Sequence, residues 1–130
     1  MDKFIVRGGN SLHGSVAISG AKNATLALMP ATLLSGGVCR LANTPRLRDI
    51  STMSALLEQM GAVVRHPGTM LELDCSNITH LEAPYDLVKK MRASFYVLGP
   101  LLTKFGYAKV SYPGGCAWGP RPVDLHIRAQ

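Results

Sequence analysis

The chain has 130 residues, a formal net charge of +6 at pH 7 and an ordinary apolar fraction. This length allows one domain with a sizeable core, and no apolar run approaches the roughly 18 residues of a membrane span. The start of the chain lacks the apolar core of a secretory signal, so we expect a cytoplasmic protein with no membrane partner.

The three cysteines, Cys39, Cys75 and Cys116, are odd in number and far apart. They fit neither a disulfide framework nor paired zinc ligands, so we expect no metal site. The basic charge indicates an anionic partner, although it can equally serve solubility alone. Basic residues cluster only over 89–92 and aromatic residues are few, which disfavours nucleic acid. A small, multiply anionic substrate explains the charge as well.

Strand-like and helix-like segments alternate along the first part of the chain. The expected elements are strands over 3–7 and 15–19, a helix over 21–34, a strand over 38–41, a helix over 50–60, and hairpin strands over 62–65 and 70–73. The first helix carries Leu26, Met29 and Leu33 on one face, and Asp49 is the expected N-cap of the second.

A long helix is expected over 86–104, with an apolar stripe and a kink at Gly99-Pro100. Gly106 ends it, a strand covers 107–112, a glycine- and proline-rich loop covers 113–120, and a third helix begins near Pro122 or Val123.

A faint internal repeat relates the two halves of the chain. A shift of 70 positions aligns Lys22 with Arg92, Leu28 with Leu98, Pro30 with Pro100 and Gly36 with Gly106. This predicts repeated strand–helix units with a basic residue early in each helix. The sequence stops within a helical run, so we expect a truncated chain with its second repeat unfinished.

Two segments have the chemistry of an anion site. In Ser19-Gly20-Ala21-Lys22-Asn23 a strand passes through a glycine into a helix, where free N–H groups and the helix dipole favour an anion. The alternative is a solvated helix start, and Arg92 can likewise be an ordinary surface group.

The loop over 113–122 is the most unusual stretch. Glycines precede Cys116, and the positive charge of Arg121 favours a reactive thiolate there. A flexible turn with an incidental thiol is the alternative, and a hydrolytic pair of Cys116 with His126 is a further one.

Five motifs together resemble the UDP-N-acetylglucosamine 1-carboxyvinyltransferase family, in its order and spacing, from Met1 to Gln130. They are Gly20-Ala21-Lys22-Asn23, Ala83-Pro84-Tyr85-Asp86, Lys90-Met91-Arg92-Ala93-Ser94, Pro113-Gly114-Gly115-Cys116 and Arg121-Pro122-Val123-Asp124-Leu125-His126. The resemblance implies transfer of the enolpyruvyl group of phosphoenolpyruvate to the 3′-hydroxyl of UDP-N-acetylglucosamine, which is the first committed step of peptidoglycan synthesis.

The resemblance also implies an α/β (α+β) fold, an inside-out α/β barrel built from βαβαββ repeats. Family members have two globular domains with the active site between them. Residues 1–21 would then be a strand segment that packs with the second domain, and 22–130 the incomplete opening part of the first. The missing C-terminal part of the same protein would be the required partner, and the chain alone would be inactive.

By the same resemblance, Cys116 would donate a proton to phosphoenolpyruvate and would be the target of fosfomycin. The phosphoenolpyruvate-binding residues would be Lys22, Asn23 and Arg121. The sugar-nucleotide-binding residues would be Arg92, Arg121, Pro122, Val123, Asp124 and Leu125. We expect neither a cofactor nor a metal for this chain.

Two other functions remain as alternatives. The sister family that acts on shikimate 3-phosphate shares the fold and chemistry but has no equivalent Pro-Gly-Gly-Cys loop, so Cys116 argues against it. A catalytically dead fragment, or a module that only binds a sugar nucleotide, is the other.

Overall fold

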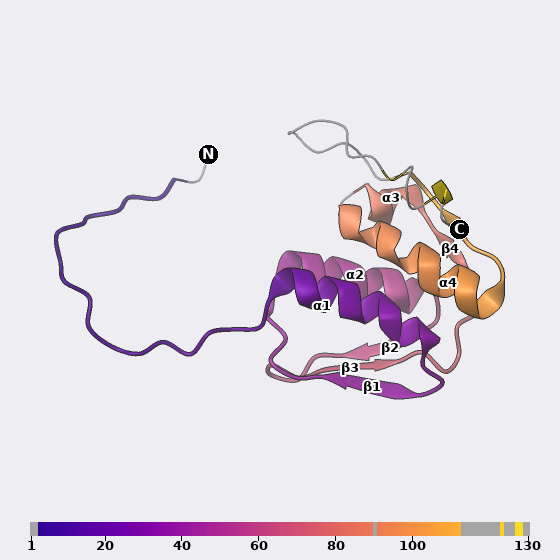
Figure 1. Cartoon of the computed structure of the whole chain (residues 1–130), viewed down its shortest axis with the longest axis horizontal. Helices are drawn as coiled ribbons and strands as arrows, with labels where there is room; N and C mark the ends of the chain where they lie inside the picture. The colour runs from indigo at the N-terminus through magenta and orange to yellow at the C-terminus, as the bar shows by residue number, and fades with distance from the viewer. Residues whose placement is uncertain (1–2, 90, 113–122, 124–126, 129–130) are drawn as a thin grey trace.

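The structure is a computed structural model, and it describes residues 3–89, 91–112, 123 and 127–128. Its folded part has a layer of helices packed on one face of a small sheet, and residues 3–19 extend away from it (Figure 1). The first half contains α1 (Lys22–Ala31), the 3₁₀ helix η1 (Thr32–Leu34), β1 (Val38–Leu41), α2 (Arg48–Gln59), β2 (Val63–Arg65) and β3 (Leu71–Asp74). These elements confirm the order and type predicted for residues 21–74.

The sheet has the order β1-β3-β2, and both outer strands run antiparallel to β3. Cys39 and Val64 both lie opposite Leu73, so the strands around it are in register. Leu71 and Leu73 are fully buried while the residues between and after them are partly exposed, because alternate side chains of a strand point to opposite faces. The buried face of β3 is the one that the helices cover (Figure 1).

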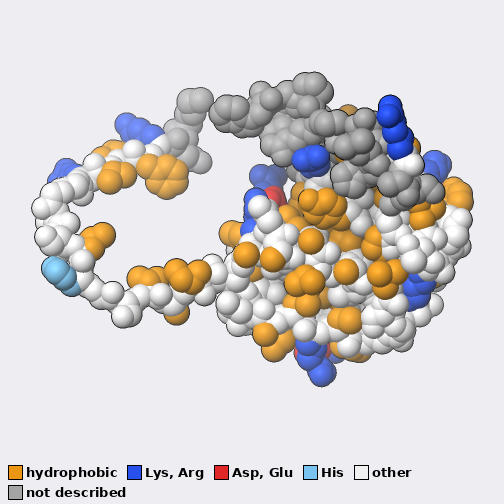
Figure 2. All heavy atoms as spheres, in the orientation of Figure 1, with side chains coloured by type: hydrophobic (Ala, Val, Ile, Leu, Met, Phe, Trp, Pro, Cys, Tyr) orange, Lys and Arg blue, Asp and Glu red, His pale blue; other side chains and the backbone are white. Residues whose placement is uncertain are grey.

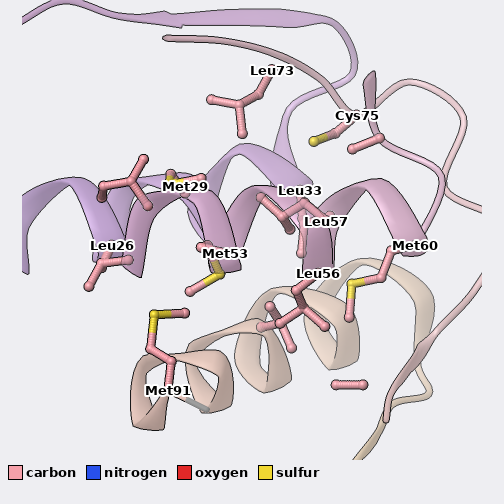
Figure 3. Packing of buried hydrophobic residues seen from close by; sticks show 14 of the residues in the cluster. Leu26, Met29, Leu33, Met53, Leu56, Leu57, Met60, Leu73, Cys75 and Met91 are labelled. Atoms are coloured by element: carbon pink, nitrogen blue, oxygen red, sulfur yellow. The ribbon is translucent and has the colours of Figure 1, made fainter. Parts of the chain in front are cut away.

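The core lies between the helices and the sheet and is rich in methionine and leucine (Figure 3). Leu26, Met29 and Leu33 are buried as predicted for the first helix, because residues three and four apart share one face. Three apolar residues of α2 and its C-cap are also fully buried: Met53, Leu56, Leu57 and Met60. Flexible methionine side chains fill irregular gaps where three helical segments meet.

The second half departs from the expected single helix. It contains β4 (Glu82–Ala83), α3 (Tyr85–Val88), the 3₁₀ helix η2 (Arg92–Val97), α4 (Leu98–Phe105) and β5 (Lys109–Val110). β4 was not predicted and pairs in parallel with β5, which is shorter than the expected strand over 107–112.

The helix break falls before Arg92 and not at Gly99-Pro100. Met91 is extended, with φ −154° and ψ 119°, and its side chain is only 7% exposed in the core. Pro100 lies in the first turn of α4, where its missing N–H costs little. Gly106 ends α4 as predicted, with φ +70°.

Three further expectations are corrected. Residues 3–7 and 15–19 form no strand in the described chain, since no neighbouring strand offers the backbone partners that a strand requires. Their apolar side chains, such as Phe4 and Val16, are exposed. Figure 2 shows hydrophobic side chains along this extended N-terminal segment. α2 begins at Arg48 with Leu47 as its N-cap, and Asp49 makes an ion pair with Lys22 in place of a cap.

The predicted loop over 113–120 lies outside the described residues, as does Pro122, one of the two residues near which the third helix was expected to begin; the other, Val123, is described. Ile127 and Arg128 are helical, and the Ile127 N–H donates to the Val123 carbonyl at 3.1 Å. Among the residues that the structure describes, no helix is long and apolar enough to cross a membrane.

Candidate active site

The beginnings of α1 and α2 lie together, and an ion pair joins them. Lys22 is the first residue of α1, and its Nζ donates to Asp49 Oδ2 at 2.8 Å in the first turn of α2. Both side chains are partly accessible, with 44% and 37% exposed. A helix N-terminus has free N–H groups and a partial positive charge, so two such ends beside an ammonium group favour an anion.

Close backbone packing fixes the entry into α1. A Cβ atom on Gly20 would lie 1.7 Å from the carbonyl oxygen of Asn43, so no other residue fits without a shift. Asn43 itself has a positive φ of +54°, which asparagine tolerates better than most residues. A cavity of about 290 Å³ opens beside this contact, with Arg40 and Thr44 in its lining. The glycine in the Gly-Ala-Lys-Asn motif is therefore a packing requirement that positions Lys22.

The loop before α2 is held by Arg46. Its Nε donates to the Gly68 carbonyl at 3.0 Å and its Nη2 to the His66 carbonyl at 2.8 Å, both in the turn between β2 and β3. In addition, the Thr44 N–H donates to the Thr69 carbonyl at 2.7 Å. These bonds tie the start of α2, and with it Asp49, to the sheet.

The structure agrees in part with the repeat predicted from the sequence, although no strand precedes α1 among the described residues and η2 is a 3₁₀ helix where α1 is an α-helix. Arg92 is the first residue of η2, as Lys22 is the first residue of α1, and both are exposed. η2 packs against α1, so the two repeated segments are neighbours. Within the same motif, the hydroxyl of Ser94 is fully buried and has no hydrogen-bond partner among the described residues.

The structure describes only some of the predicted site residues. Lys22 and Asn23 lie together at the exposed start of α1, and Arg92 begins η2. Val123 is 2% exposed, so its side chain packs inside the chain. The other predicted site residues lie outside the described part: Cys116, Arg121, Pro122, Asp124 and Leu125.

Asp49 is the residue whose position the sequence reasoning missed. Its place before an apolar helix suggested a cap, whereas its carboxylate faces Lys22 across 27 positions of sequence. The available signal was an acidic residue in the first turn of one helix and a basic residue at the start of the preceding helix. In a strand–helix repeat, these two positions lie at the same end of the layer.

Comparison with known proteins defines the class. The family model of EPSP synthase (3-phosphoshikimate 1-carboxyvinyltransferase) matches residues 6–129, and the chain belongs to this family. The crystal structure of the enolpyruvyl transferase NikO from Streptomyces tendae has a similar fold, with a TM-score of 0.69 and 28% identity over 78% of this chain and 24% of that one. The predicted fold class is thereby confirmed.

Within this class the chain is similar to proteins named UDP-N-acetylglucosamine 1-carboxyvinyltransferase. It is 55% identical to the one from Prosthecochloris aestuarii over 99% of this chain. It is 56% identical to the one from Paracoccus denitrificans, also over 99% of this chain. The chain spans 31% of the length of each of these two relatives.

Proposed function

We propose that this chain forms part of an enzyme that transfers the enolpyruvyl group of phosphoenolpyruvate to the 3′-hydroxyl of UDP-N-acetylglucosamine. The observation that carries the proposal is the pair of adjoining helix N-termini, joined by the ion pair of Lys22 in α1 with Asp49 in α2. The names of relatives that are more than half identical support this choice of substrates over shikimate 3-phosphate. The proposed reaction is the first committed step of peptidoglycan synthesis, so we expect loss of the enzyme to stop cell-wall growth and cell division.

In the proposed chemistry, Lys22 and Asn23 bind phosphoenolpyruvate at the start of α1. The ammonium offsets phosphate and carboxylate charge, and the amide of Asn23 offers hydrogen bonds. Arg121 would bind the same substrate, while Arg92 and residues 121–125 would bind the sugar nucleotide.

The reaction has an addition and an elimination. The 3′-oxygen of the sugar bonds to C2 of phosphoenolpyruvate and gives its proton to a carboxylate outside this chain, while Cys116 protonates the methylene carbon. In the elimination, the new methyl group of the tetrahedral intermediate returns a proton to the thiolate left on Cys116. Phosphate leaves from C2, and the carbon–carbon double bond is restored. A general acid in this role is typically worth a factor of roughly 10² to 10⁴ in rate.

The site needs a second part of the protein. We propose that residues 22–130 belong to one globular domain and that residues 1–21 pack with a second one. The exposed apolar side chains of that segment, including Ile5, Val6 and Ile18, support this arrangement because they lack cover within the described chain. The cytoplasm is the expected location of the enzyme.

The test is phosphate release by a full-length enzyme. This chain would replace the matching 31% of the Prosthecochloris aestuarii relative. Release from phosphoenolpyruvate should require UDP-N-acetylglucosamine, should stop on addition of fosfomycin, and should fall at least 100-fold in Cys116→Ala. Release with shikimate 3-phosphate alone, or with neither acceptor, would contradict the proposal. A Cys39→Ala variant is the matched control, since Cys39 is a free, partly exposed cysteine on β1 that has no role in the proposed chemistry.

A further inference from the structure

We propose that Asp49 is a positioning residue that holds the ammonium group of Lys22 in place for phosphoenolpyruvate. This inference rests on the proposed function and adds a residue to its site. The direct observation is the contact between Lys22 Nζ and Asp49 Oδ2 at 2.8 Å, between side chains of different helices.

The electrostatics of the two helices explain why Lys22 needs such a partner. A cation at a helix N-terminus meets the positive end of the dipole, so Lys22 is disfavoured at the first residue of α1. A carboxylate in the first turn is favoured, which suits Asp49 in α2. The ion pair therefore fixes an ammonium group at a place from which the helix dipole alone would repel it.

A gain in folding stability does not explain the Lys22–Asp49 ion pair. Ion pairs with this degree of exposure contribute little to the free energy of unfolding, because water screens them and two side chains must be ordered. Orientation matters far more in catalysis, where a misplacement of about 1 Å can cost 10²-fold in rate. Freed from Asp49, the four-carbon chain of Lys22 would sample several rotamers around the substrate phosphate.

The scaffold around the pair supports this role. Asp49 is tied to the sheet through the Arg46 bonds to the β2–β3 turn, and Lys22 is placed by the contact of Gly20 with Asn43. Each partner thus stands on a backbone held by interactions outside its own helix. A positioning group requires such rigid support.

The experiment uses the full-length chimeric enzyme with Asp49→Asn. We expect kcat to fall about 5- to 50-fold, with a KM for phosphoenolpyruvate that does not rise, because the lost carboxylate no longer repels the anion. Asp49→Glu should recover part of the loss. A double-mutant cycle with Lys22→Gln should show that Asp49→Asn costs less than twofold once Lys22 is absent.

Glu82→Gln is the matched control. It removes another exposed lysine–carboxylate pair, that with Lys109 at 3.3 Å, and Glu82 lines a cavity with Gln59 at the far end of α2. Asp49 and Gln59 are separated by roughly 15 Å along the helix. Thermal unfolding of each variant checks that the fold is kept, and Glu82→Gln should leave kcat within twofold.

The outcomes separate the two proposals. An active parent enzyme whose Asp49→Asn variant keeps its kcat within twofold would overturn the positioning role and leave the proposed function standing. Equal losses from Asp49→Asn with and without Lys22 would overturn it as well. A parent enzyme that releases no phosphate would overturn both.

Discussion

Lys104, near the end of α4, caps the C-terminal end of the helical segment formed by α1 and η1. Its Nζ donates to the carbonyls of Leu33 and Ser35, at 2.7 Å each, although these residues are 71 and 69 positions away. The last carbonyls of a helix lack partners within it, so a cation there satisfies them and complements the dipole. A single side chain thus links the repeated units at the end opposite Lys22.

Replacing Lys104 by methionine should therefore weaken the fold. The free energy of unfolding should fall by about 1–2 kcal/mol, because two carbonyls lose a charged donor that water replaces only in part. Urea unfolding, followed by circular dichroism, measures this change. Lys109→Met is the control, since its ammonium group pairs with the exposed carboxylate of Glu82. An equal effect of the two substitutions would contradict the capping role.

At the scale of elements, the contact between the start of α1 and the loop after β1 decides where the site forms. Asn43 lies just beyond β1, and its carbonyl oxygen occupies the space that a side chain on residue 20 would need. Such backbone-to-backbone contact cannot relax by a change of rotamer. The position of Lys22 relative to α2 depends on it.

Gly20→Ala should thus displace the start of α1. Overpacking against rigid backbone typically costs about 1–3 kcal/mol, and we expect the upper end of that range or more. The matched control is Gly36→Ala, because an added Cβ there meets nothing within 4 Å. Urea midpoints of both variants test this, and in the full-length enzyme Gly20→Ala should also lower kcat. A Gly20→Ala protein as stable as Gly36→Ala would show that the observed contact is wrong.

The segment over 85–105 shows which features of a helix the local sequence pattern predicts and which it does not. Its apolar spacing predicted one helix, and its helical content and its end at Gly106 are confirmed. The break was placed at Gly99-Pro100 because proline disrupts helix interiors. It falls instead where Met91 turns into the core, and that depends on the neighbouring helices and not on local propensity (Figure 3).

At the scale of the whole molecule, acid should destabilise the chain through Asp74. Hydrogen bonds from the hydroxyl and the N–H of Ser76, at 2.7 and 3.0 Å, lower the pKa of this carboxyl below its ordinary value of 3.8. A carboxyl whose pKa is lower in the folded state stabilises the fold above its unfolded pKa. That contribution is lost as the pH falls through the folded pKa.

Asp74→Asn should accordingly reduce the free energy of unfolding at pH 7, and this reduction should shrink as the pH falls through the folded-state pKa of Asp74. Urea unfolding between pH 2 and pH 7 measures the difference between the two proteins. Ser76→Ala should change the pH dependence of the free energy of unfolding in the same direction, since it removes one of the two hydrogen-bond donors to Asp74. If the difference in unfolding free energy between the parent protein and Asp74→Asn does not vary with pH, the titration of Asp74 does not contribute to acid destabilisation.

Local patterns in the sequence were enough to predict the secondary structure of residues 21–74, the buried faces of its helices, and the corresponding positions of Lys22 and Arg92 at the start of two helical segments. These features follow from periodicity and from glycine and proline, which act over a few residues. Three features depend on tertiary contacts instead: Asp49 faces Lys22, Met91 interrupts a helix, and β4 pairs with β5. The tertiary structure also showed that residues 3–21 form no strand without a partner. Such features depend on which distant segments meet, and burial and backbone pairing between them override local preference.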